Sequence, residues 1–411
     1  MTTDLRRLVV VGASLAGLRA VEAARRAGFT GSITLLGAEP RAPYDRPPLS
    51  KALLQPDGPA VVQPFHTEEH LRTELGVDLR VGAPATGLDL AGRQVVVGAE
   101  RVGSRIDYDG LILATGATAN TWPPGVGVPG VHPLRTAADG LAIRAALDAG
   151  KRVAIVGAGF IGSEVASAAR ARGLPVTLIE AAPQPLTRSV GPAVAEVLTG
   201  LHRSAGVDLR VGTQVTEIHQ TGSGVTGLSL SDGTTVPAEL VVLGIGARPA
   251  TDWLRDSGLA LHRDGGVLVD ATLATSAPGV YAAGDVAHAP LSVFDGDVVR
   301  LEHWTSAAEQ GAAAMRNLLD PLAARPLQTV PYFWSDWHGH RLQFVGVPTA
   351  DEVHVIRPEP ERFLALYRRG ERIVGAFTIN GRREIMRYRR HIVGRAPFEA
   401  ALTEAATPAA V

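Results

Sequence analysis

A glycine-rich stretch in the middle of the chain has the spacing of a turn that binds a dinucleotide. Residues 157–162 read Gly-Ala-Gly-Phe-Ile-Gly, so Gly157, Gly159 and Gly162 form an intact G-x-G-x-x-G. Because these positions carry no side chain, the main chain can approach a pyrophosphate, whose charge then lies at the N-terminus of the next helix. The stretch therefore predicts a dinucleotide site.

A second stretch near the N-terminus repeats this spacing with one change. Residues 12–17 read Gly-Ala-Ser-Leu-Ala-Gly, which keeps Gly12 and Gly17 but places Ser14 where the middle glycine usually stands. The hydroxyl of Ser14 is small and can donate a hydrogen bond to a phosphate. We therefore expect this stretch to bind a dinucleotide as well.

Both stretches must be positioned by strand–turn–helix–strand units. In the first unit, the apolar residues 8–11 predict a buried parallel strand, a helical pattern runs to residue 26, and residues 32–36 predict the next strand. The second unit repeats this order with a strand at 152–156, a helix to residue 171 and a strand at 176–180. One such turn is common in α/β proteins for purely structural reasons, but two copies in the same context indicate two bound dinucleotides.

Each unit is followed by an acidic residue that can accept hydrogen bonds from a ribose. Glu180 ends the second strand of the later unit, where a carboxylate binds a free ribose hydroxyl and repels a 2′-phosphate. No arginine occurs in the next three residues, 181–183, so the sequence favours NADH over NADPH. Glu39 is the corresponding residue of the first unit, one place later than the closest register.

The composition excludes several kinds of chemistry. The 411-residue chain contains no cysteine, which removes disulfides, thiolate metal sites, iron–sulfur ligation and cysteine nucleophiles. We expect no metal site. The net charge of −1 gives no reason to expect nucleic acid or a membrane as a partner, and no apolar run approaches the roughly 20 residues of a spanning helix. The chain has the composition of a cytoplasmic protein.

Two later segments place polar residues at the ends of strands. The apolar residues 111–113 lead into Ala114-Thr115-Gly116, and residues 241–249 repeat that pattern near the end of the second unit. These segments predict the crossings between two nested domains, and we expect Ala114, Thr115 and Gly116 to contact the cofactor. Asp285 follows a strand in the sequence Ala-Ala-Gly-Asp, where an aspartate can accept hydrogen bonds from the ribityl chain of a flavin.

The chain resembles the oxygenase-coupled NADH-dependent ferredoxin reductases, which are FAD proteins with two dinucleotide-binding domains and a glutathione-reductase-like fold. The most specific match is Pro-Tyr-Asp-Arg-Pro-Pro-Leu-Ser-Lys at 43–51, a region where the glutathione-reductase branch carries its cysteine pair. Further matches are Gly-Phe-Ile-Gly-Ser-Glu at 159–164, Arg-Leu-Glu-His-Trp at 300–304 and Tyr-Phe-Trp-Ser-Asp at 332–336. The resemblance extends from residue 8 to about 346.

The resemblance implies an α/β fold with two Rossmann-like dinucleotide-binding domains, one inserted in the other, and a C-terminal α+β domain. The FAD-binding domain would comprise residues 1–110 and 245–322, the NADH-binding domain residues 111–244, and the C-terminal domain residues 323–411.

The resemblance also implies roles for individual side chains. Lys51 would lie near the reactive edge of the flavin and pair with Glu164, and its charge would stabilise the negative charge that builds on the ring during hydride transfer. The other flavin contacts would be Arg46 and Pro48 on one side of the cofactor and Glu302 and Trp304 on the other, with Asp285 on the ribityl chain. Several of these residues also have a purely structural interpretation. Lys51 can be a solvated surface residue, residues 46–48 can form a rigid loop, and Trp304 can be a core residue.

The activity implied is hydride transfer from NADH to FAD and then single-electron transfer to a small iron–sulfur ferredoxin. That ferredoxin would serve a haem-thiolate monooxygenase or a Rieske dioxygenase. A rubredoxin reductase is the nearest alternative, and a non-catalytic NADH-sensing flavoprotein resembling apoptosis-inducing factor is a more distant one. The arginines at 382, 383, 387, 389 and 390 are either a patch that attracts an acidic ferredoxin or a solvated face.

Overall fold

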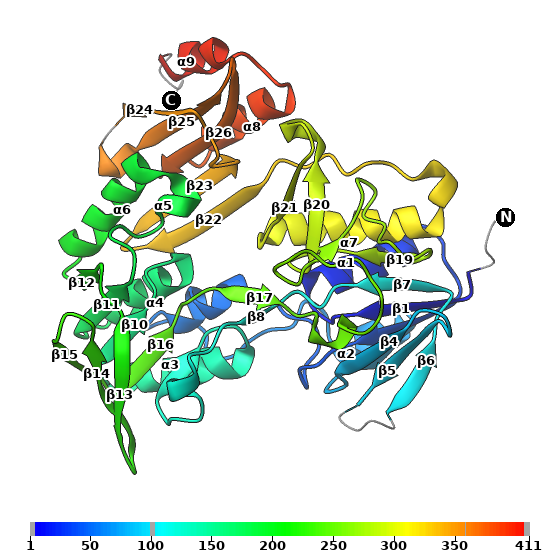
Figure 1. Cartoon of the computed structure of the whole chain (residues 1–411), viewed down its shortest axis with the longest axis horizontal. Helices are drawn as coiled ribbons and strands as arrows, with labels where there is room; N and C mark the ends of the chain where they lie inside the picture. Colours follow the sequence, from blue (N-terminus) through cyan, green and yellow to red (C-terminus); the bar gives the residue numbers. More distant parts are fainter. Residues whose placement is uncertain (1–4, 99–102, 358, 407–411) are drawn as a thin grey trace. The chain divides into compact units, whose positions relative to one another are not determined.

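The computed structural model describes residues 5–98, 103–357 and 359–406, which form two compact units (Figure 1). Unit 1 consists of residues 1–45, 63–118 and 248–331, and unit 2 of residues 46–62, 119–247 and 332–411. The α/β class with two Rossmann-like sheets and an added C-terminal sheet, predicted from the sequence, is confirmed. The three-domain division at 110/111, 244/245 and 322/323 stays a prediction.

Unit 1 is built on a five-stranded parallel sheet with the order β19-β7-β1-β2-β3. The central strand β1 (Arg7–Val11) is an apolar run whose last four residues are buried. Its side chains alternate between the two faces, as the period of two requires, so that Val10 and Val9 enter different core clusters. The other strands are β2 (Ser32–Leu36), β3 (Val77–Arg80), β7 (Gly110–Leu113) and β19 (Val280–Ala282).

Two helices pack side by side against this sheet (Figure 1). They are α1 (Leu15–Arg26) and α7 (Trp304–Leu319). Gly311 of α7 lies so close to α1 that an added Cβ would be 2.1 Å from the carbonyl oxygen of Ala16. Small residues therefore set the distance between the two helices.

The remaining elements of unit 1 are short. The antiparallel sheet β4-β5-β6 lies between β3 and β7 along the chain, and the sheet β18-β20-β21 lies within the last segment. The bounds are α2 (Glu68–Thr73), β4 (Ala85–Asp89), β5 (Gln94–Val97), β6 (Ser104–Asp107), β18 (Val267–Leu268), β20 (Ala287–Leu291) and β21 (Asp297–Arg300). The chain passes between the units along β8 (Ala117–Ala119) and β17 (Ala247–Pro249), and also between residues 45 and 46, 62 and 63, and 331 and 332.

Unit 2 repeats the five-stranded parallel sheet, here in the order β12-β11-β10-β16-β9. Its central strand β10 (Val153–Val156) is followed directly by the second glycine turn and by α4 (Phe160–Ala171). The other elements of this part are β9 (Val131–Pro133), α3 (Ala137–Asp148), β11 (Val176–Glu180), α5 (Thr187–Val190), α6 (Pro192–Ser204), β12 (Asp208–Val211) and β16 (Leu240–Leu243). A three-stranded antiparallel sheet consists of β13 (Val215–Thr221), β14 (Gly224–Leu230) and β15 (Thr235–Pro237).

The C-terminal part of unit 2 is an antiparallel sheet with the order β22-β23-β26-β25-β24. Its strands are β22 (Tyr332–Trp337), β23 (His340–Gly346), β24 (Glu352–Arg357), β25 (Leu364–Arg369) and β26 (Arg372–Ile379), followed by α8 (Ile385–Val393) and α9 (Phe398–Ala406). Strand β22 packs against α4. In the part of the chain that the structure describes, no helix has the length and apolarity needed to cross a membrane.

Candidate functional site

The predicted flavin-site residues of unit 1 gather at one edge of its parallel sheet. Gly12 follows β1, Ala114 follows β7, Glu39 lies three residues after β2, and Asp285 lies three residues after β19. Because the carboxyl ends of parallel strands meet at the same edge, the structure brings these residues to a common side.

The first glycine turn leaves no room for side chains at its outer positions. Gly12 has a φ of +121°, and a Cβ there would lie 2.0 Å from the carbonyl oxygen of Ala114. A Cβ on Gly17 would lie 2.0 Å from the carbonyl oxygen of Gly12. Both glycines are therefore required for the chain to turn directly from β1 into α1.

The groups around this turn fit an anionic nucleotide. Ser14 is the N-cap of α1, and no acidic side chain occupies the first helical turn, so the positive end of the helix dipole is not neutralised there. The hydroxyl of Thr115, at the end of β7, is buried and has no hydrogen-bond partner within the described part of the chain. A buried hydroxyl of this kind is satisfied when a polar ligand binds beside it. This observation supports the predicted cofactor contact of Thr115, and that contact stays a prediction.

Three further residues that were predicted to contact the flavin, Asp285, Glu302 and Trp304, have polar partners within unit 1. The Arg300 guanidinium donates to the carbonyl oxygen of Asp285 at 3.0 Å and forms an ion pair with Glu302 at 2.7 Å. The Trp304 indole, at the start of α7, donates to Asp45 at 2.7 Å. Arg300 and Asp45 were not singled out from the sequence, although both lie inside the stretches that carried the family resemblance.

Glu39, the predicted ribose ligand of the first unit, has a neighbour from the same loop. The Tyr44 hydroxyl donates to its Oε2 at 2.7 Å. This bond fixes the carboxylate near the end of β2.

In unit 2, the second glycine turn has the same construction as the first. Gly157 has a φ of +98°, and an added Cβ would lie 2.3 Å from the carbonyl oxygen of Gly244. A Cβ on Gly162 would lie 2.1 Å from the carbonyl oxygen of Gly157. At the middle glycine, Gly159, a Cβ would meet nothing within 4 Å. Gly159 is the N-cap of α4, so this open space lies at the helix N-terminus, where a pyrophosphate binds.

Glu180, the last residue of β11, is held beside this turn. Its carboxylate accepts hydrogen bonds from the backbone N–H of Ala158 at 3.0 Å and of Ala182 at 2.9 Å. The side chain is thus fixed by main-chain donors from both loops, next to the helix N-terminus. This is the position in which a carboxylate binds the adenosine ribose of NADH.

Lys51 and Glu164 form the most completely connected polar group of unit 2. Their side chains make an ion pair of 2.7 Å, with 18% of the Lys51 side chain and 2% of the Glu164 side chain exposed. Glu164 also accepts short hydrogen bonds from the hydroxyls of Ser50 and Ser335. A buried carboxylate is stable only when such donors compensate for its lost hydration. The structure therefore brings the two residues together, while their role in hydride transfer stays a prediction.

The neighbours of this pair were missed by the sequence reasoning. Ser50 and Ser335 lie within the two stretches quoted for the resemblance, but nothing in a single sequence indicated that their hydroxyls face Glu164. The Trp337 indole donates to the hydroxyl of Ser335 at 2.7 Å, and this bond fixes that donor in place.

Arg46 and Pro48 also belong to unit 2. Pro48 is in a 3₁₀ turn, Pro47–Leu49, and the Arg46 side chain donates to the carbonyl oxygen of Arg135 at 2.6 Å. The 3₁₀ turn and this hydrogen bond make the loop rigid, which agrees with the purely structural interpretation of residues 46–48. Their contact with a flavin stays a prediction.

Part of the arginine cluster near the C-terminus lines a cavity. Arg382, Arg383 and Arg387 line a cavity of about 970 Å³ together with Arg170 and Arg341, all of them in unit 2. The cavity is thus predominantly basic, and its use as a docking surface stays a prediction.

Comparisons with known proteins give a consistent result over nearly the whole chain. Residues 6–311 match the family described as pyridine nucleotide-disulphide oxidoreductase, and residues 332–409 match a reductase C-terminal family. The chain is 36% identical over 406 residues to the ferredoxin–NAD(+) reductase component of the p-cumate 2,3-dioxygenase system of Pseudomonas putida, which covers 97% of this chain and 96% of that protein. It is 39% identical over 345 residues to the corresponding component of the biphenyl dioxygenase system of Paraburkholderia xenovorans, which covers 82% and 80%.

A solved structure has the same fold. The reductase in the covalent putidaredoxin reductase–putidaredoxin complex superposes with a TM-score of 0.90 at 32% identity, over 97% of this chain and 95% of that one.

Proposed function

Since this chain belongs to the pyridine nucleotide-disulphide oxidoreductase family, we propose that it is an FAD-dependent, NADH-oxidising ferredoxin reductase. It takes hydride from NADH and delivers electrons singly to a small iron–sulfur ferredoxin. That ferredoxin serves an oxygenase, either a haem-thiolate monooxygenase or a Rieske dioxygenase. The names of two relatives assign those relatives to dioxygenase systems. We place the protein in the cytoplasm.

One observation carries this proposal: two dinucleotide turns, the second with all three glycines and the first with Ser14 at the middle position, occur in a chain of 411 residues that contains no cysteine. Members of the family that reduce disulfides or peroxides need a redox-active thiol. Without one, electrons can leave a bound flavin only through an external acceptor. A one-electron protein carrier agrees with the relatives that match over almost the full length.

FAD supplies the redox chemistry, and the chain's own residues supply orientation and charge. Lys51 holds a positive charge close to the predicted reactive edge, where negative charge develops during hydride transfer. Glu164 keeps the Lys51 ammonium in one position, and the hydroxyls of Ser50 and Ser335 keep the Glu164 carboxylate in one position. Glu180 selects the unphosphorylated ribose of NADH.

The first experiment is anaerobic stopped-flow absorbance of the purified yellow protein, mixed separately with NADH and with NADPH. We expect fast bleaching of the flavin band with NADH and slow bleaching with NADPH. Equal bleaching by the two would overturn the role of Glu180. Slow bleaching by both would favour the NADH-sensing alternative over the reductase.

The acceptor is tested separately. The NADH-reduced protein is mixed with a [2Fe–2S] ferredoxin or with a rubredoxin, with cytochrome c as the final acceptor. Faster reduction through the ferredoxin supports the proposal, and faster reduction through the rubredoxin supports the neighbouring activity.

The role of Lys51 has a matched control, because the chain contains only one other lysine, the exposed Lys151. We expect Lys51→Gln to retain FAD but to slow flavin bleaching by NADH on the order of 100-fold, the size of effect seen when one stabilising donor is removed. Lys151→Gln should bleach at the wild-type rate. Equal rates of flavin bleaching in the two variants would show that Lys51 has a structural role and no role in hydride transfer.

A further inference from the structure

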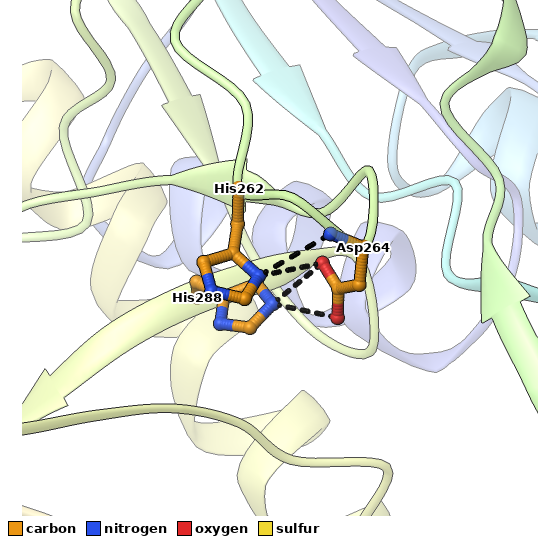
Figure 2. A group of neighbouring side chains, drawn as sticks. All are labelled: His262, Asp264 and His288. Carbon is orange, nitrogen blue, oxygen red and sulfur yellow. Dashed lines mark hydrogen bonds and ion pairs between the residues drawn. The ribbon is translucent and has the colours of Figure 1, made fainter.

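Three side chains of unit 1, outside the predicted cofactor site, converge on one point (Figure 2). They are His262, Asp264 and His288, and the potential ligand atoms of all three lie within 4.8 Å of one another. His262 Nδ1 is 3.0 Å from Asp264 Oδ1, and His288 Nε2 is 2.9 Å from both carboxylate oxygens. Figure 2 shows the two imidazoles next to each other, with one nitrogen of each directed at the carboxylate, and their planes are tilted by 34°. The ring centroids are 4.1 Å apart.

Hydrogen bonds alone do not satisfy every contact among these three side chains. The Nδ1 atom of His262 lies 3.0 Å from a carboxylate oxygen and 3.4 Å from the backbone N–H of Asp264. It must carry a proton to bond the first and a lone pair to bond the second, so only one of the two contacts can form at a time. A cation at the point of convergence would accept the lone pairs of both imidazoles and of the carboxylate together.

The carboxylate is held in place by donors that do not block this point. The backbone N–H of Gly266 donates to Oδ1 at 2.9 Å, and the Arg300 guanidinium donates to Oδ2 at 3.3 Å. Metal-binding carboxylates are commonly oriented by hydrogen bonds of this kind. The site is also reachable: 38% of the Asp264 side chain and 35% of the His262 side chain are exposed, whereas His288 is 8% exposed.

We propose that His262, Asp264 and His288 form a binding site for Zn²⁺, with His262 Nδ1, His288 Nε2 and an Asp264 oxygen as ligands. Two imidazole nitrogens and one carboxylate oxygen suit Zn²⁺ rather than Mg²⁺ or Ca²⁺, which take oxygen ligands. Water from the exposed side completes a tetrahedral arrangement. The sequence alone predicts no metal site, because the chain contains no cysteine and the two histidines are 26 positions apart.

The nearby Arg300 sets the strength of this site. Its positive charge repels a dication, so binding is weaker than in a site with three ligands and no adjacent cation. Arg300 also bonds the Asp285 carbonyl and Glu302, so an ion at Asp264 would compete with a side chain that contacts the predicted flavin side. The binding proposal does not depend on the proposed function.

The test is calorimetric titration of the tag-free protein with ZnCl₂, supported by the visible spectrum of the Co²⁺ form. We expect one Zn²⁺ per chain and a Co²⁺ spectrum typical of tetrahedral N/O coordination. His262→Gln and Asp264→Asn should each weaken Zn²⁺ binding by at least about tenfold, the effect that loss of a supporting group alone can produce. His262 is partly exposed, so its variant is the one expected to fold normally.

The matched control is His66→Gln. His66 and His70 are stacked with ring centroids 4.6 Å apart, and His66 is 3.1 Å from Glu22, so this pair is another place in unit 1 where histidines and a carboxylate meet. His66→Gln should leave the Zn²⁺ affinity unchanged. Absence of one-to-one binding would overturn the proposal, as would loss of binding in His66→Gln with retention in His262→Gln.

Discussion

Helices α1 and α4 begin at equivalent glycine turns but pack on their neighbours in opposite ways. Helix α1 lies against α7 through small and apolar residues, and the backbones approach so closely at Gly311 that no side chain fits there. Its buried residues are all apolar or glycine. Contact of this kind fixes position by shape alone.

Helix α4 instead buries a polar face. Ser163 and Glu164 are 0% and 2% exposed. Ser163 is hydrogen-bonded to His202 at 3.0 Å, and His202 to His338 at 3.0 Å, while Glu164 is bound by Lys51 and two serine hydroxyls. Every partner of this face therefore has to be present, because each would otherwise leave a buried polar atom unsatisfied. The comparison indicates that the same turn motif can begin helices with different environments, and that of these two helices it is α4 that carries a buried polar network.

Substitution of the last glycine in each turn should have the largest effect on stability and on cofactor binding. In Gly17→Ala and Gly162→Ala the new Cβ would lie 2.0 Å and 2.1 Å from a backbone carbonyl oxygen, so the strand and the helix must separate. We expect a loss of about 1–3 kcal/mol of stability in each variant. Gly17→Ala should also lose FAD, whereas Gly162→Ala should keep FAD and lose NADH binding. Flavin absorbance per chain and NADH titration measure the two effects, and loss of FAD in both variants would contradict the assignment.

The buried polar face of α4 should make unit 2 sensitive to acid. Burial, with a smaller contribution from His338, lowers the pKa of His202 to about 3, whereas an unfolded histidine titrates near 6.5. Since the folded pKa is depressed, the unfolded state binds the proton first. Stability is therefore complete above about pH 6.5 and falls as the pH decreases toward 3.

Between pH 7.5 and 5 the loss from His202 should be about 2 kcal/mol. Urea midpoints at several pH values measure it. His202→Gln should be less stable at pH 7.5 and depend less on pH below 6.5. His219→Gln, which changes a histidine that is 38% exposed, should retain the wild-type slope. Parallel pH profiles for the wild type and His202→Gln would contradict the prediction.

The two acidic residues after the turns should differ in the cofactor that they affect. Glu180 is held by two backbone N–H groups beside its turn, and Glu39 by the Tyr44 hydroxyl. We expect Glu180→Gln to raise the Kd for NADH about tenfold, or about 1.4 kcal/mol, and to reduce the preference over NADPH. Glu39→Gln should leave the NADH affinity unchanged and weaken FAD retention. An unchanged NADH:NADPH ratio in Glu180→Gln would show that another residue selects the cofactor.

The sequence predicted the parts of the fold that depend on local backbone requirements. Gly12 and Gly157 need positive φ and close approach, and continuous apolar strands precede them, so both units could be identified from spacing alone. The carboxyl-edge positions of Asp285 and Glu180 followed from the strands before them.

The buried network around Glu164 could not be predicted in this way. Its donors come from residues 50, 51 and 335, which are more than 100 positions from Glu164 along the chain, and no periodic pattern relates them. The same holds for the histidine chain from Ser163 to His338. The proposed Zn²⁺ site could not be predicted from the sequence, because a histidine, an aspartate and a second histidine at irregular spacing match no local motif.

Substitutions at the middle position of each turn should have the smallest effect on stability. They also give the sharpest test of whether the two turns are equivalent. Ser14 and Gly159 are the N-caps of α1 and α4, and a Cβ on Gly159 would meet nothing within 4 Å in the protein itself. Ser14→Gly should therefore cost only a few tenths of a kcal/mol. Gly159→Ser should leave thermal stability unchanged without cofactor. If the two turns hold their pyrophosphates alike, Gly159→Ser should also keep NADH binding within about twofold, because the first turn accepts serine at this position. A larger loss of NADH affinity, with stability unchanged, would show that the second turn holds its cofactor closer to the backbone than the first.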